Sequence, residues 1–205
     1  MTTPDIAAGD LHGMPVVVAE LHSSLPAVLA GIRSVAPQAR VAYVMTDSAA
    51  LPFALSDSAA HLVAAGWLAT TITAGQAFGG EHESITVHSA LLAARHVPGC
   101  DLAVVAQGPG NAGSSTTRGW SGLSTGDALN AVHVLRGHGV AVPRVSGSDP
   151  RARHLGLSHH TATVLSRTLL GAADVVVPSG DVEPWPQVRE QVAAAVASAA
   201  GSPGW

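Results

Sequence analysis

Six short runs rich in β-branched residues constrain the fold most, because each is followed by a polar or glycine-rich turn and then by a helical pattern. The runs span residues 16–19, 41–45, 70–73, 102–106, 140–145 and 175–177. This alternation is typical of β-α-β units, in which helices connect parallel strands. Since the runs are apolar without strict alternation, helices should cover both faces of the sheet. The sequence therefore predicts an α/β fold with a mostly parallel sheet of about five to six strands.

The length and composition suit one domain. The chain has 205 residues, of which 47% are hydrophobic, enough for one continuous core. We expect a single domain over 15–200, with a flexible N-terminus over 1–14 and a flexible tail over 201–205. The first residues lack the basic stretch and apolar run of a signal peptide. The apolar runs are shorter than the ~20 residues that span a bilayer, so a cytoplasmic protein without a membrane partner is expected.

The charged residues narrow the choice of ligands. They make up 12% of the chain and leave a net charge of −4, which provides no basic field for nucleic acid. The chain has no lysine, so Walker-type phosphate loops, Schiff-base chemistry and pyridoxal phosphate are excluded as standard chemistry. Arginine favours bidentate recognition of carboxylates and phosphates. Four arginines fall within one third of the chain: Arg118, Arg144, Arg151 and Arg153.

Three polar loops follow predicted strands, over 76–83, 107–122 and 146–161. In open parallel sheets such loops gather at the carboxyl edge of the sheet, where ligands bind. In the middle loop, glycine amides and hydroxyl groups can form an anion cradle. Its candidate ligand-binding residues are Gln107, Gly108, Gly110, Asn111, Gly113, Ser114, Ser115, Thr116 and Arg118. The alternative is a glycine-rich connection that binds nothing.

The same glycines partly match a dinucleotide-binding fingerprint. However, Pro109 lies inside the motif and the next helix begins only near Ser124. The acidic residue expected at the end of the next strand, ~20 residues further on, is also missing. A nicotinamide or flavin cofactor is therefore disfavoured, and the cofactor stays unknown.

The third loop concentrates groups for acid/base chemistry. A carboxylate could orient a histidine there for proton transfer. Its candidates are Asp149, His159 and His160 as catalytic residues, with Arg151, Arg153 and His154 as ligand-binding residues. In the alternative interpretation, Asp149 closes a turn, the arginines face water, and Ser158 caps a helix that begins with the two adjacent histidines. On the helix after the middle loop, Asn130 could line the same cleft or serve packing.

The first loop combines carboxylates with imidazoles, which can bind a divalent metal ion. Here Glu81 and Glu83 are candidate acids or bases, and Gln76, Gly79 and Gly80 are candidate ligand-binding residues. The set His82, Glu83 and His88 is a candidate metal site, although its spacing matches no established metal motif. A solvated turn before an acidic helix start is the alternative.

The stretch from residue 22 to residue 178 contains several short motifs in a fixed order. They are AYVMTD at 42–47, TAGQAFGG at 73–80, QGPGN at 107–111, ALNA at 128–131 and SHHT at 158–161. Through these motifs the chain resembles a bacterial family catalogued as domain-of-unknown-function family 3866. The resemblance implies that these loops form the site, and it implies no particular reaction.

Three functions follow as hypotheses. The leading one is an enzyme that acts on a phosphorylated or carboxylated metabolite by acid/base chemistry, as a hydrolase, lyase or isomerase. A second is a non-catalytic ligand-binding or regulatory module with the same anion cradle. A third is a metal-dependent enzyme that uses a His/Glu site. Helices rich in small residues, including residues 193–200, also make a homodimer a further expectation.

Overall fold

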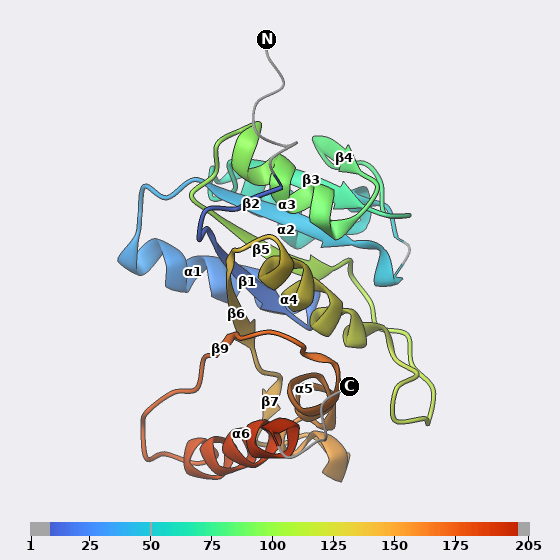
Figure 1. The fold of residues 1–205 in the computed structure, drawn as a ribbon, viewed down its shortest axis with the longest axis vertical. Coiled ribbons are helices and arrows are strands. Elements are labelled where there is room, and N and C mark those ends of the chain that lie inside the picture. Colours follow the sequence, from blue (N-terminus) through green and yellow to red (C-terminus); the bar gives the residue numbers. More distant parts are fainter. Residues whose placement is uncertain (1–8, 50, 201–205) are drawn as a thin grey trace.

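A computed structural model of the chain describes residues 9–49 and 51–200 (Figure 1). Its main sheet has the strand order β4-β3-β2-β5-β1-β6-β9, and all neighbouring strands are parallel. The strands are β1 (Pro15–Ala19), β2 (Val41–Thr46), β3 (Thr70–Ala74), β4 (His82–Ser84), β5 (Leu102–Gln107), β6 (His138–Val142) and β9 (Asp174–Val175). A separate antiparallel pair consists of β7 (Val145–Ser146) and β8 (Gly156–Leu157).

The predicted single α/β domain with a mostly parallel sheet is confirmed, with one strand more than the upper estimate. The additional strand of the main sheet is β4, whose polar residues His82, Glu83 and Ser84 carry no strand pattern. The expected run 140–145 is also interrupted. Pro143 has no amide hydrogen to donate to the sheet, so β6 ends at Val142 and β7 begins in a different pair.

Helices cover both faces of the sheet, as predicted. The helices α1 (Leu25–Val35) and α2 (Asp57–Ala64) cover one face, and α3 (Val87–His96) and α4 (Ser124–Val134) cover the other. Successive residues of β2 point to opposite faces. Val44 packs into the core beneath α3 and α4, whereas Tyr43 and Met45 pack beneath α1 and α2.

The C-terminal part of the chain packs around a core of its own. Here α5 (His159–Thr163), a π-helical turn over Val164–Thr168 and α6 (Trp185–Ala200) lie beyond the β6–β9 edge of the main sheet (Figure 1). Their core comprises Leu157, Leu165, Val188, Val192 and Ala195. Ser158 caps α5, because its Oγ accepts a hydrogen bond from the backbone amide of His160.

Residues 11–14 of the N-terminal segment pack against the rest of the domain. The side chains of Leu11 and Met14 are buried in the core beneath α4, and the Leu11 amide donates a hydrogen bond to the carbonyl of Leu135 over 2.8 Å. Residues 1–8 and the expected tail at 201–205 lie outside the described residues. Within the described part of the chain, no helix has the length and apolar character to cross a membrane.

A buried polar chain joins α2 to the sheet. The hydroxyl of Tyr43 lies 2.9 Å from Nδ1 of His22 and donates to the carbonyl of Gln107 over 3.3 Å. Nε2 of His22 lies 2.7 Å from the hydroxyl of Ser56, which caps α2. Burial lowers the pKa of His22, so the ring stays neutral inside this chain. The hydrogen bonds satisfy groups that would otherwise destabilise the core.

Replacing Tyr43 with Phe should therefore lower the free energy of unfolding by about 1–3 kcal/mol, because the buried Nδ1 of His22 would lose its hydrogen bond to the Tyr43 hydroxyl. Urea denaturation followed by circular dichroism measures the change. As a control, Val35→Ala at a solvent-exposed position should change stability by less than about 0.5 kcal/mol. Equal denaturation midpoints for Tyr43→Phe and the wild type would contradict this role.

Candidate functional site

A pocket of about 640 Å³ lies between the loop that follows β5 and the segment that follows β6. These are two of the three loops singled out in the sequence. The β5 loop contributes residues 111–117 and Trp120, and the other segment contributes Arg144, Arg151, Arg153, His154, His159 and His160. The pocket therefore brings hydroxyl groups, guanidinium groups and imidazole rings together.

A buried carboxylate supports the pocket from the sheet. Glu20 directly follows β1 and is only 4% exposed. Its Oε1 accepts a hydrogen bond from Nδ1 of His160 over 2.7 Å and one from a guanidinium nitrogen of Arg144 over 3.2 Å. Because the carboxylate engages Nδ1, the neutral His160 ring presents Nε2 to other partners. Glu20 was not among the residues predicted from the sequence, although an acid directly after the first apolar run is a detectable feature.

An aromatic contact fixes the plane of the His160 ring. The Trp120 indole stacks on this imidazole with ring centroids 3.8 Å apart and an interplanar angle of 4°. The indole is buried, and its Nε1 donates to the carbonyl of Thr117 over 2.8 Å. Trp120 was also missed in the sequence, although it lies within the glycine-rich loop over 107–122. Together with Glu20, it holds His160 in one orientation.

The other two histidines are held as neutral rings. His154 is 2% exposed, and burial followed by the nearby Arg144 lowers its pKa to about 4. Its Nδ1 lies 2.8 Å from the hydroxyl of Ser158. Burial is also the main cause that lowers the pKa of His159, whose Nε2 is buried without a hydrogen-bond partner. Both imidazoles can therefore offer a nitrogen lone pair at neutral pH.

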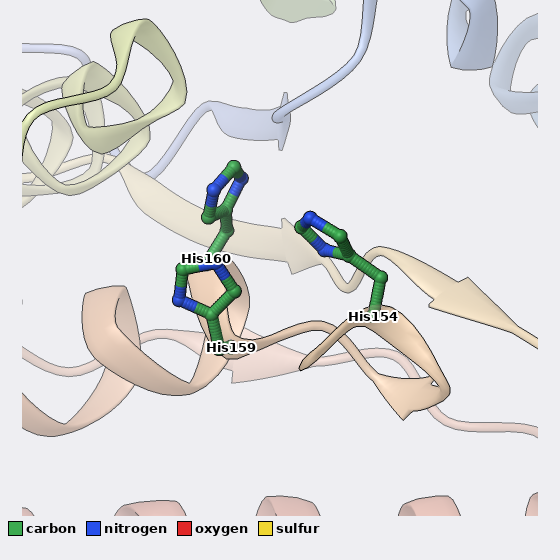
Figure 2. A group of neighbouring side chains, drawn as sticks. All are labelled: His154, His159 and His160. Carbon is green, nitrogen blue, oxygen red and sulfur yellow. The ribbon is translucent and has the colours of Figure 1, made fainter. Parts of the chain in front are cut away.

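The three rings lie side by side, as Figure 2 shows, and point to the same side of the segments that carry them. One ring nitrogen from each of His154, His159 and His160 lies within 4.8 Å of the others. Within residues 9–49 and 51–200, no other group of three or more metal-ligating side chains lies close enough together to hold one ion.

The arginines around the pocket differ in how far they are neutralised. Arg144 pairs with Glu20, whereas Arg151 pairs with Asp149 through two hydrogen bonds of 2.8 and 2.9 Å. Arg153 forms no ion pair with an acidic residue of the described chain, and its Nε approaches Nε2 of His154 at 3.4 Å. Its charge is therefore available to an anionic ligand.

One expected partnership is corrected by these contacts. Asp149 was expected to orient a histidine, but its carboxylate is engaged by Arg151, which holds the pKa of Asp149 well below its usual range. Glu20 occupies the expected position beside His160 instead. Asp149 forms an ion pair with Arg151, its near neighbour in sequence. The imidazole of His160 instead bonds the carboxylate of Glu20, which directly follows β1.

The first loop does not reach the pocket, because residues 82–84 form β4 at the opposite edge of the sheet from β9. Glu81 accepts a hydrogen bond from the hydroxyl of Thr70 over 2.8 Å, and Glu83 accepts one from the amide of Gly79 over 2.9 Å. The expected set His82, Glu83 and His88 is not among the close groups of metal-ligating residues in the described chain. The candidates of this loop that do not line the pocket are Gln76, Gly79, Gly80, Glu81, His82, Glu83 and His88.

Only some of the candidate residues of the middle loop line the pocket. Its pocket-lining candidates are Asn111, Gly113, Ser114, Ser115 and Thr116, whereas Gln107, Gly108, Gly110 and Arg118 do not line the pocket. Gln107 is buried, and its side chain donates to the backbone carbonyl of Glu20 over 3.1 Å. Asn130 has a packing role, because its amide group bonds the backbone of Thr168 and Leu170 over 2.9 and 2.8 Å.

The fold and the pocket thus define an α/β protein with a histidine- and arginine-lined site at the carboxyl edge of its sheet. The chain belongs to the family described as "Protein of unknown function (DUF3866)", whose model matches residues 5–201. The resemblance seen in the sequence motifs is thereby confirmed. Comparisons with curated proteins and with solved structures found no match.

The depressed pKa of His154 makes stability depend on pH. In the folded state the ring is protonated only near pH 4, whereas in the unfolded chain it takes up a proton near its ordinary pKa of 6.5. The unfolded state therefore binds more protons between these values, and the free energy of unfolding should fall as the pH drops from about 6.5 to 4, by up to about 1.4 kcal/mol per pH unit. The lowered pKa of His159 acts in the same direction.

Urea denaturation of chelator-treated protein at several pH values measures this slope. Replacing His154 with Asn should flatten it, whatever the variant's absolute stability. The matched variant His61→Asn, at an exposed position of α2, should keep the slope of the wild type. A steep slope that persists in His154→Asn would show that other groups cause the dependence.

Proposed function

We propose that the protein is an enzyme that acts on a small metabolite carrying a phosphate or carboxylate group, bound in the pocket between the β5 loop and the segment after β6. The observation that carries this proposal is the Glu20–His160 pair, with 2.7 Å between Oε1 and Nδ1, at a pocket lined by arginines. A buried carboxylate that orients an imidazole is an arrangement suited to proton transfer.

The charges of the pocket support an anionic ligand. Glu20 and Asp149 each neutralise one arginine, which leaves the positive charge of Arg153 without an acidic partner in the described chain. The exposed hydroxyl groups of Ser114, Ser115 and Thr116 add hydrogen-bond donors on the facing wall. Phosphates and carboxylates are the groups that a guanidinium and several hydroxyls bind together.

The geometry around His160 supports acid/base catalysis. Glu20 engages Nδ1 and Trp120 fixes the plane of the ring, so Nε2 is the nitrogen that can exchange a proton with a ligand. Glu20 would also stabilise the imidazolium form that arises when His160 takes up a proton. Hydrolysis, elimination and isomerisation all require such a proton transfer. The expected cytoplasmic location and homodimer stay predictions.

Binding can be tested first with a panel of simple anions, including inorganic phosphate, acetate, malate and glycerol phosphate, by thermal shift and then calorimetry. For an anion that binds, Arg153→Gln should weaken affinity at least about tenfold, since a charge-assisted hydrogen bond contributes roughly 1.5–3 kcal/mol. Arg118→Gln is the matched control, because this arginine belongs to the β5 loop but does not line the pocket. Equal losses in both variants, or no binding of any anion, would count against the proposed site.

Catalysis can then be tested with esters, hydroxy acids and sugar phosphates related to the anions that bind. Replacing Glu20 with Gln keeps the shape of the side chain but removes its charge, so turnover should fall about 10²- to 10⁴-fold. Calorimetry should show a much smaller change in ligand affinity. A tight ligand that the wild-type protein never converts would instead support the non-catalytic binding module.

A further inference from the structure

The three-histidine cluster has the composition of a catalytic metal site. The ring centroids of His154, His159 and His160 are separated by 4.4, 4.9 and 5.1 Å, and the rings face a common space (Figure 2). Three imidazoles with one open position are a recognised ligand set for catalytic zinc. Imidazole nitrogens also suit copper, iron and nickel. The cluster is therefore chemically able to hold one divalent transition-metal ion.

The hydrogen bonds around two of the rings leave the lone pair on the same nitrogen, Nε2. On His160, the Glu20 carboxylate accepts from Nδ1, which leaves the lone pair on Nε2. On His154, Nε2 accepts from Arg153, so the hydrogen lies on Nδ1 and is donated to Ser158. A ligating histidine commonly donates its other ring N–H to a carboxylate or another oxygen in this way. The 3.4 Å contact of Arg153 is long, and this flexible side chain can move away.

The third ring supplies an independent observation. Nε2 of His159 is buried and has no hydrogen-bond partner within the described chain. A buried nitrogen of this kind is costly unless something else occupies its lone pair. A metal ion between the rings would satisfy it and would use the same nitrogen type as the other two histidines.

We propose that His154, His159 and His160 bind one divalent transition-metal ion through their Nε2 atoms, with Glu20 and Ser158 as positioning residues. The metal-binding site stands on this geometry alone, and its role in catalysis rests on the anionic ligand of the proposed function. An ion at Nε2 of His160 would occupy the lone pair that otherwise exchanges a proton, so a coordinated water would carry the proton transfer instead. When bound, such an ion polarises an oxygen of the anion and lowers the pKa of a coordinated water. Arg153 would then hold the far side of an anion that contacts the metal.

Calorimetry of the untagged, chelator-treated protein with ZnCl₂ tests the proposal directly. The expected result is one Zn²⁺ per chain. Titration with CoCl₂ should produce the visible absorption of four- or five-coordinate Co²⁺, which reports the ligand set independently of activity. Both His159→Gln and His160→Gln should weaken Zn²⁺ binding at least hundredfold. The second variant covers the case in which the first fails to fold.

The positioning role of Glu20 has its own readout. Glu20→Gln should weaken Zn²⁺ binding about 10- to 100-fold and alter the Co²⁺ spectrum, and Glu20→Asp should restore part of the affinity. The double variant His82→Gln/His88→Gln is the matched control, because it removes two histidines that lie outside the pocket. It should bind Zn²⁺ as the wild type does.

Two outcomes would overturn the metal site: no Zn²⁺ binding by the wild-type protein, or binding that survives both His159→Gln and His160→Gln. Failure of this inference is distinguishable from failure of the proposed function. Anion binding that depends on Arg153 in a protein that binds no Zn²⁺ would remove the metal site and keep the proposed function. Stoichiometric Zn²⁺ binding without any anion binding would support the metal site and remove the proposed function.

Discussion

The site depends on one buried negative charge, the carboxylate of Glu20 at the end of β1. A carboxylate removed from water destabilises the fold unless charged or hydrogen-bonding partners surround it. Arg144 and His160 are those partners, and both belong to the chain after β6. The backbone of Arg144 in turn bonds Ser158 and Thr161 at the start of α5, so the ion pair and the adjacent backbone contacts join the sheet to the C-terminal part.

Strand order explains why Glu20 and His160 meet although 140 positions separate them in the sequence. β1 lies beside β6, and Ala19 is in register with Val142, so Glu20 emerges next to the segment that continues to Arg144. Pro143 ends the strand there and lets the chain turn away from the sheet. The pocket therefore lies between the carboxyl edge of the main sheet and the smaller C-terminal core.

The fold was predictable because hydrophobic runs and turn residues are local properties of the sequence. The contents of the site were only partly predictable, since they depend on strand order. Asp149 was the natural partner for a histidine by proximity in sequence, yet the parallel pairing of β1 and β6 brings Glu20 to His160. The first loop followed a predicted strand as the other two did, but β4 carries it to the far edge of the sheet. Trp120 could not be assigned because stacking on a distant ring leaves no local pattern.

The charge balance of the pocket connects its arginines to its histidines. Arg144 and Arg151 lie close enough to His154 to oppose its protonation, after burial the next largest causes of its lowered pKa. The positive charges of these two arginines thus help to keep the His154 ring neutral. A neutral imidazole is the form that donates a lone pair to a proton or a metal ion. Glu20 and Asp149 neutralise two of the arginines, Arg144 and Arg151. Under the proposed function, the remaining charge of Arg153 would also attract the anionic ligand toward the neutral rings of His154 and His159.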